Sequence, residues 1–534
     1  MRFVNSKSMW LVGVLFCLAL AGCGSKELDE ERKVLIFSSN SDVTSIDPQI
    51  ASGLSEPIIL CAIFEGLVVP DSVTYQPRPG VADRWSISEN GKIYEFHLRD
   101  SAKWSNGDAI TAEDFVFSVK RALSSKLNCP SVKLFFPLRN AEKFYKKQVR
   151  DFNEVGIRAI DKHTLRIELE QPLNSFMHII MQPCWYPLNE AVCETIGRYN
   201  DWNDFFASII SNGPFMVIDK KTNRSVILEK NPYYWDYEAV KLDGVRFIVG
   251  ANIIQNLNMF RNGNIDICTY NPQSAYFSPD LIDEDDVKTE VHFGCFYLLL
   301  NTKNKPLDDK NVRMALSMAL RRNVLLNLLS MTNEPAAYGL IPTLGPDYVA
   351  TKMFEEDHIH ARELLAAAGY GDGKNFPKMR ILCNGSKRQN TVCTFLKNEL
   401  KNVLDIDVDI DYVRQDEFLF MRREGNFDIC CGDWFGDYPD PEKFLKVFSR
   451  KNQQNYCRWH SIEYDELLNA AANMHNEKER LRLLKDAECL LMRNMPVIPL
   501  YFESELYLMK KRVSGWDAGL LDIHQWKSVD VEGE

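Results

Sequence analysis

A stretch of acidic and aromatic residues in the C-terminal third carries side chains with clear chemical potential. It reads Trp434-Phe435-Gly436-Asp437-Tyr438-Pro439-Asp440-Pro441. Asp433 directly precedes this stretch and Glu442 directly follows it. A carboxylate enclosed with an ammonium group forms a strong charge-assisted hydrogen bond. Aspartate is also favoured in turns of this composition, and four carboxylates are hard oxygen donors for a metal ion, although no glycine-centred calcium loop surrounds them. Cation binding, metal binding and a solvated turn all remain open.

Catalysis is not indicated by the other reactive side chains. A nucleophile would need an activating histidine nearby, and neither G-x-S-x-G nor H-E-x-x-H occurs. The nine histidines are scattered, and the closest two, His358 and His360, would face apart on a helix. A phosphate-binding G-x-x-x-x-G-K-[ST] loop is also absent from the sequence. These absences argue against an enzyme, and we expect neither a cofactor nor a resident metal ion.

The cysteines indicate packing more than chemistry. The chain has 14, of which Cys17 lies in an apolar N-terminal run and Cys23 directly after it. The remaining cysteines form no C-x-x-C pair, which argues against a zinc ribbon or a thioredoxin site. Some could pair in an oxidising compartment. We expect most to be buried free thiols that behave as small hydrophobic groups.

The first residues indicate export. Arg2 and Lys7 are followed by an apolar run, Met9 to Leu20, and then by Ala21-Gly22-Cys23. A short apolar run that ends in small residues is typical of a secretory signal, and it is too short for a bilayer span, which needs about 20 residues. The pattern resembles a bacterial lipoprotein signal. That resemblance implies a signal peptide over 1–22, lipid attachment at Cys23, a tether over 23–32 and a protein on the cell membrane that faces the periplasm or the exterior.

Length and charge restrict the class of protein further. At 534 residues the chain is long enough for three or four domain-sized units. Its formal net charge of −11 argues against nucleic acid as a partner, because phosphate binding requires a basic face.

The pattern of apolar residues predicts the elements that must position these side chains. Residues 34–37 are typical of a buried strand, and 93–98 alternates as a half-buried strand should. Thr111 is expected to cap a helix. Helical periodicity is expected over 312–320 and 360–368. Strand-like segments at 379–383, 408–413 and 427–431 alternate with helical ones, which predicts an α/β region with some parallel pairing.

Several motifs occur in an order that points to one family. They include Ser45-Ile46-Asp47-Pro48-Gln49, Ala102-Lys103-Trp104-Ser105-Asn106-Gly107-Asp108, Asn231-Pro232-Tyr233-Tyr234-Trp235-Asp236, Asn301-Thr302-Lys303 and the stretch from Trp434 to Pro441. With them the chain resembles the extracytoplasmic solute-binding proteins of ABC peptide importers, the oligopeptide- and dipeptide-binding family. The resemblance implies a two-lobed α/β periplasmic-binding-protein fold of type II, in the large class with an extra domain, and a ligand cleft between the lobes. The implied first lobe is 33–64 with 190–285 and 503–534, the extra domain is 65–189, and the second lobe is 286–502.

The resemblance also assigns roles to individual residues. Asp437 would bind the α-amine of a peptide, Trp434 and Gly436 would lie beside its backbone, and Ser52-Gly53-Leu54 would line the pocket from the first lobe. Candidates for the ligand carboxylate are Lys387, Arg388, Arg422 and Arg423. Cys431 stands where the oligopeptide-binding branch often places an arginine, and a neutral thiol cannot clamp a carboxylate. Arg321 departs from the family's Ala-x-Asp-Arg pattern, and we expect it in a surface or interdomain ion pair.

The function implied by the resemblance is capture without chemistry. A monomer would bind oligopeptides between its lobes and deliver them to a membrane permease driven by a separate ATPase. A nickel chelate, haem or a cell-wall peptide on the same fold, and a peptide sensor or chaperone-like lipoprotein, remain alternatives.

Overall fold

The computed structural model describes residues 32–41, 43, 45–51, 56–197, 209–221, 225–270, 283–329, 335–371, 375–517, 519–521 and 523–532. The predicted signal peptide and lipid-attachment residue Cys23 lie outside the described residues, as do Ser52, Gly53 and Leu54. In the described part of the chain, no helix is both long and apolar enough to cross a membrane.

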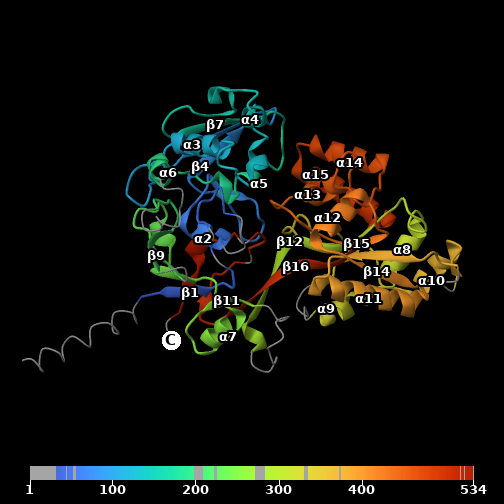
Figure 1. Ribbon diagram of the computed structural model, residues 1–534. Coiled ribbons are helices and arrows are strands. Elements are labelled where there is room, and N and C mark those ends of the chain that lie inside the picture. Colours follow the sequence, from blue (N-terminus) through green and yellow to red (C-terminus); the bar gives the residue numbers. More distant parts are fainter. Residues whose placement is uncertain are drawn as a thin grey trace, which may run out of the picture.

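The molecule has two lobes that share one mixed ten-stranded sheet (Figure 1). The strand order is β14-β13-β15-β12-β16-β11-β1-β10-β9-β8. The first lobe contributes β1 (Val34–Ser38), β8 (Phe215–Lys221), β9 (Ser225–Lys230), β10 (Gly244–Ile248) and β11 (Ile267–Tyr270). The second lobe contributes β12 (Val287–Leu300), β13 (Met379–Cys383), β14 (Val408–Tyr412), β15 (Ile429–Phe435) and β16 (Val497–Met509).

Two long antiparallel strands, β12 and β16, join the lobes (Figure 1). The second half of β16 pairs with β11 of the first lobe, and its first half pairs with the part of β12 that also pairs with β15. The register between β12 and β16 shifts between Val291 and Cys295. The domain boundaries near residues 285 and 503 stay a prediction, and this crossing lies beside both of them.

A separate four-stranded sheet, β4-β5-β7-β6, lies beside the first lobe. Its strands are β4 (Ala82–Ile87), β5 (Ile93–Leu98), β6 (Ile157–Ala159) and β7 (Thr164–Glu168). The alternation predicted for 93–98 is confirmed, because Tyr94, Phe96 and Leu98 are buried. Thr111 forms the predicted cap of α3 (Ala112–Ala122), with Asp114 completing a capping box. This sheet and the first lobe share one buried core.

The remaining elements of this half are short. They are α2 (Glu56–Ile63), β2 (Val68–Pro70), β3 (Pro77–Pro79), α4 (Ala141–Tyr145), α5 (Phe176–Ile179), α6 (Glu190–Gly197), α7 (Ile253–Arg261), β17 (Val513–Ser514) and β18 (Asp530–Val531). The C-terminal tail returns to the first lobe, where the indole N–H of buried Trp526 donates to the Ile58 carbonyl at 2.9 Å.

The second lobe has its own core and confirms the α/β prediction, because β13 pairs in parallel with both β14 and β15. Its helices are α8 (Lys310–Met318), α9 (Arg322–Leu328), α10 (His358–Ala367), α11 (Lys387–Leu404), α12 (Gln415–Glu424), α13 (Glu442–Leu445), α14 (Ile462–Ala472) and α15 (Glu477–Asn494). Gly369, at φ +93°, follows α10 as predicted. The 12 cysteines of the described part are free thiols and ten are buried, which confirms the packing role.

Candidate functional site

The candidate residues gather where parallel strands of the second lobe end. Helix α11 follows β13, and the turn with Asp437 follows β15. Since β13 and β15 are parallel, their carboxyl ends lie at the same edge of the sheet, the position where open α/β sheets bind ligands. Beyond this edge, the Ser175 hydroxyl lies 3.4 Å from the Tyr438 hydroxyl. The turn therefore contacts the other half of the molecule and lies between the two halves.

Asp437 already holds an ammonium group. Its carboxylate lies 2.6 Å from Lys443 Nζ, and 58% of its side chain is exposed. Lys443 comes from the short helix α13 and lies 4.9 Å from the centre of the Tyr438 ring. Within the molecule, Lys443 thus stands in for the kind of cation that Asp437 is predicted to bind.

Asp440, another acid of this stretch, forms buried contacts within the protein. Asp440 is buried and forms an ion pair with buried Arg480 of α15. Glu477 also contacts Arg480, at 3.0 Å, and Asp440 accepts a hydrogen bond from the Glu442 backbone N–H at 2.9 Å. Among the described residues, no three His, Cys, Asp or Glu side chains gather to hold a metal ion. Asp440 therefore stabilises the turn through its buried pair with Arg480, whereas Asp437 stays accessible to solvent.

Trp434 and Gly436 shape the approach to the turn. Trp434 is half-buried against the core of the second lobe, and its indole N–H has no hydrogen-bond partner in the described structure. The Gly436 N–H donates to the Phe293 carbonyl at 2.9 Å. A Cβ at Gly436 would lie 2.2 Å from the Phe293 ring, so glycine permits this close approach.

Arg388, at the start of α11, is already engaged. Its Nε donates to the Tyr501 hydroxyl at 2.6 Å, and its guanidinium forms an ion pair with Glu503. The guanidinium carbon lies 4.3 Å from the centre of the Phe296 ring. Burial raises the pKa of Glu503, and the Arg388 charge opposes that rise. About a third of the Arg388 side chain remains exposed (32%).

The other predicted cations lie apart from this pair. Lys387 is exposed on the first turn of α11. Arg422 lies 5.1 Å from the centre of the Tyr456 ring, and Arg423 bonds to Glu424 at 3.3 Å. None of these contacts joins Arg422 or Arg423 to Arg388 or Asp437.

Cys431 does not reach the surface of the site. It is fully buried under α11, and its Sγ lies 3.8 Å from the Sγ of Cys393. The neutral thiol belongs to the packing between strand and helix.

Sequence reasoning missed several neighbours of these residues. Lys443, Tyr501 and Glu503 were not among the candidates, and Asp433 was considered only as a metal donor. Glu503 directly follows the apolar run Val497–Phe502, and an acid at the end of such a run is the signal that could have found it.

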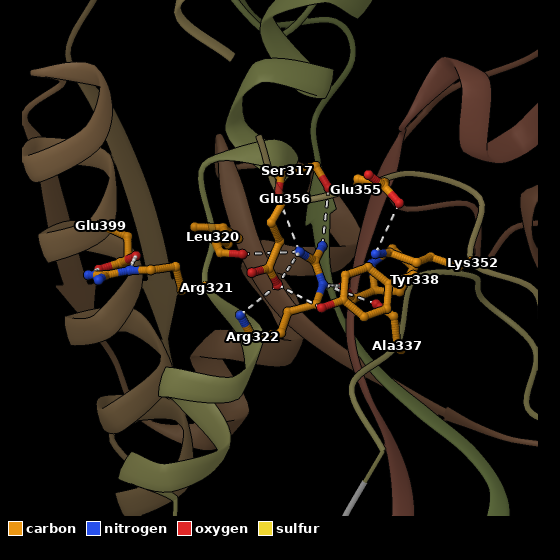
Figure 2. A network of polar contacts seen from close by, with 11 residues as sticks. Ser317, Leu320, Arg321, Arg322, Ala337, Tyr338, Lys352, Glu355, Glu356 and Glu399 are labelled. Atoms are coloured by element: carbon orange, nitrogen blue, oxygen red, sulfur yellow. Dashed lines mark hydrogen bonds and ion pairs between the residues drawn. The ribbon is translucent and has the colours of Figure 1, made fainter. Parts of the chain in front are cut away.

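Arg321 forms an ion pair with Glu399 in the second lobe (Figure 2). Its guanidinium bonds both carboxylate oxygens of Glu399 on α11, at 2.6 and 2.8 Å. The expected ion pair of Arg321 thus forms within the second lobe, between a half-exposed arginine and a buried glutamate.

Two lobes joined by crossing strands, with charged side chains at the sheet edge between them, define a bilobed solute-binding protein. The chain belongs to the bacterial extracellular solute-binding proteins, family 5, whose sequence profile matches residues 76–456. The family predicted from the motifs is thereby confirmed.

The similarity to individual relatives extends over nearly the whole chain. It is 29% identical to the dipeptide-binding protein DppE of Bacillus subtilis, over 95% of this chain and 96% of that protein. It is 28% identical to the periplasmic oligopeptide-binding protein OppA of Salmonella typhimurium, over 97% of this chain and 96% of that protein.

Solved structures of one relative also indicate the conformation. The structure is similar to the periplasmic murein tripeptide-binding protein MppA in its unliganded open form, with a TM-score of 0.85, 27% identity, and coverage of 94% and 98% of the two chains. A second structure of MppA, from Escherichia coli, gives a TM-score of 0.68 at the same identity, with 94% and 99% coverage. The arrangement of the lobes thus resembles the open form.

Proposed function

We propose that this protein is the substrate-binding component of an ABC importer and captures oligopeptides between its lobes. Asp437 binds the α-amine of the peptide, and closure about the β12 and β16 crossing buries the ligand. The closed protein then delivers the peptide, as a monomer, to a membrane permease driven by a separate ATPase. The sequence around Cys23 supports a lipid anchor, which would raise the effective concentration of the protein near its permease.

The observation that carries the proposal is the Asp437–Lys443 pair at the sheet edge between the lobes. The Asp437 side chain is 58% exposed, so it can exchange the ammonium of Lys443 for the ammonium of a ligand. The names of three relatives, which specify a dipeptide, an oligopeptide and a murein tripeptide, support a peptide as that ligand. The MppA similarity favours a cell-wall peptide as a second candidate of the same chemical class.

Replacing Asp437 tests the anchor directly. In D437N, affinity for a free-amine tetrapeptide should fall about tenfold or more, because a charge-assisted bond contributes about 1.5–3 kcal/mol. The N-acetylated tetrapeptide should bind both proteins equally weakly. Isothermal titration of the purified protein measures both, and native mass spectrometry shows whether peptides co-purify. Equal affinity of D437N and wild type for the free-amine peptide would refute the assignment.

Lys443 offers a test with the opposite sign. If Lys443 competes with the ligand amine, K443M should bind the free-amine tetrapeptide up to about fivefold more tightly, since an exposed ion pair is worth about 0–1 kcal/mol. Lys401 is matched as a control, because it also pairs with acids on the surface of the second lobe. K401M should leave the affinity unchanged. Weaker peptide binding by K443M would instead show that Lys443 supports the ligand.

A further inference from the structure

At one end of the site, Arg388 is not free to bind a ligand carboxylate. The Arg388 guanidinium is divided between Tyr501 and Glu503 and lies over the Phe296 ring. Neighbouring Cys431 is buried and faces Cys393. An α-carboxylate arriving here would have to displace Glu503 from its own ion pair.

Asp433 faces this same end of the site. Phe296 pairs across the sheet with Asp433 on one side and with Tyr501 on the other, and directly paired residues point to the same face. Glu503 lies two residues beyond Tyr501 and shares that face. The negative charge of Asp433 contributes to the raised pKa of Glu503, which places the two carboxylates close together.

Asp433 is exposed and has no ion pair with any described residue. Arg388 and Glu503 are paired with each other, so Arg388 does not neutralise the negative charge of Asp433. Further along β16, Glu505 lies 3.9 Å from His292 and adds another acid to the same region. Closure of the lobes would remove water from Asp433, and burying an unpaired carboxylate is costly. A ligand that brings a positive charge relieves this cost, whereas one that brings a carboxylate increases it.

The spacing along β15 sets the position of that charge. Asp433 precedes Asp437 by four residues, and the chain is extended as far as Phe435. At about 3.4 Å per residue, and because the chain bends after Phe435, the two positions are separated by at most roughly 13 Å along the chain. An extended peptide with its amine on Asp437 therefore brings its third or fourth residue opposite Asp433.

We infer that the ligands of this protein are peptides with a basic side chain at the third or fourth position, and that Asp433 is the residue that selects it. The inference rests on the proposed peptide-binding function and adds the chemical class of peptide to it. Arg388 acts as a positioning residue, because its pair with Glu503 fixes the charge around Asp433.

Titration of the full-length protein with matched tetrapeptides tests the inference. Ala-Ala-Lys-Ala, Ala-Ala-Nle-Ala (norleucine) and Ala-Ala-Glu-Ala share a free amine and differ in the charge of one side chain; the same set with the variable residue at the fourth position covers the alternative spacing. Wild type should bind the lysine peptide about tenfold more tightly than the norleucine peptide, and the glutamate peptide most weakly. In D433N these differences should shrink to about twofold, mainly because the norleucine and glutamate peptides bind more tightly than to wild type once closure no longer buries an unpaired carboxylate. D416N serves as the control, since Asp416 is an exposed acid of the same lobe that pairs with Arg414. It should keep the wild-type preference.

The outcomes separate this inference from the proposed function. If all peptides bind wild type with equal affinity, or the glutamate peptide binds best, the inference is overturned and peptide capture stands. If D433N keeps the preference for lysine, Asp433 is not the selecting residue. If no peptide binds wild type at all, the proposed function itself fails.

Discussion

Two arginines of the second lobe, Arg322 and Arg388, both lie over aromatic rings but are held in different ways. Arg322 is completely buried and bonds to the backbone carbonyls of Ala337 at 3.0 Å and Pro499 at 2.9 Å (Figure 2 shows the Ala337 bond). It also donates to the carbonyls of Ser317 and Leu320. Arg388 is partly exposed and bonds only to side chains. A cation that bonds to backbone in several segments is part of the scaffold, whereas one held by side chains at an edge can respond to a ligand.

The pKa values of the two arginines are shifted in opposite directions. Burial lowers the pKa of Arg322 to about 10, although Glu356, 3.7 Å away, favours the charged form. At Arg388, burial also disfavours the cation, but its interactions with the Tyr501 hydroxyl and the Glu503 carboxylate outweigh it and raise the pKa. The scaffold arginine is therefore held against its desolvation by neutral carbonyls together with Glu356. The edge arginine is held by acids that a ligand would have to meet.

Replacing Arg322 should have the largest effect. R322M leaves several buried carbonyls without their donor and Glu356 without its counter-charge, and breaking a buried ion pair by removing one partner costs about 3–5 kcal/mol. We expect a loss of that size in the free energy of unfolding, measured by urea denaturation. The matched control is R414Q, because Arg414 is 83% exposed. A loss below about 1 kcal/mol for R322M would contradict its role as a scaffold.

Replacing Arg388 should cost less and depend on pH. R388Q leaves Glu503, whose side chain is 9% exposed, without its counter-charge. Because Arg388 is partly exposed, we expect a loss of about 2 kcal/mol at pH 8, below the range for fully buried pairs. Glu503 has a raised pKa when folded, so the native state binds more protons than the unfolded state, and stability falls as pH rises above the ordinary glutamate value. Removing Arg388 raises that pKa further.

The gap in stability between wild type and R388Q should therefore be small near pH 4 and widen toward pH 8. Urea unfolding at a series of pH values measures it. A gap that stays constant across this range would show that Glu503 does not titrate against Arg388. That result would remove the electrostatic part of the difference between the two arginines.

The sequence predicted the elements of the site better than its charge pairs. Strand β13 has the predicted bounds because its apolar run coincides with its buried pairing. Strand β15 was predicted at 427–431 and lies at Ile429–Phe435, since its pairing with β12 continues through Asp433, where the apolar pattern is broken. The pair between Arg388 and Glu503 joins residues 115 positions apart, and only the return of β16 brings them together. No local pattern encodes such a contact.

Cys431 offers the smallest expected effect and marks where the site ends. It was a candidate ligand-binding residue, yet its thiol is fully buried and contacts the Cys393 thiol instead of the sheet edge. C431S is nearly isosteric, and the serine hydroxyl has Cys393 within reach, so we expect a loss of stability of about 1 kcal/mol. Peptide affinity should stay within about twofold of wild type, because nothing that faces the ligand changes. A tenfold change in affinity in the same titration would extend the site beneath α11, and the side chains facing a ligand would then include one that is now assigned to the scaffold.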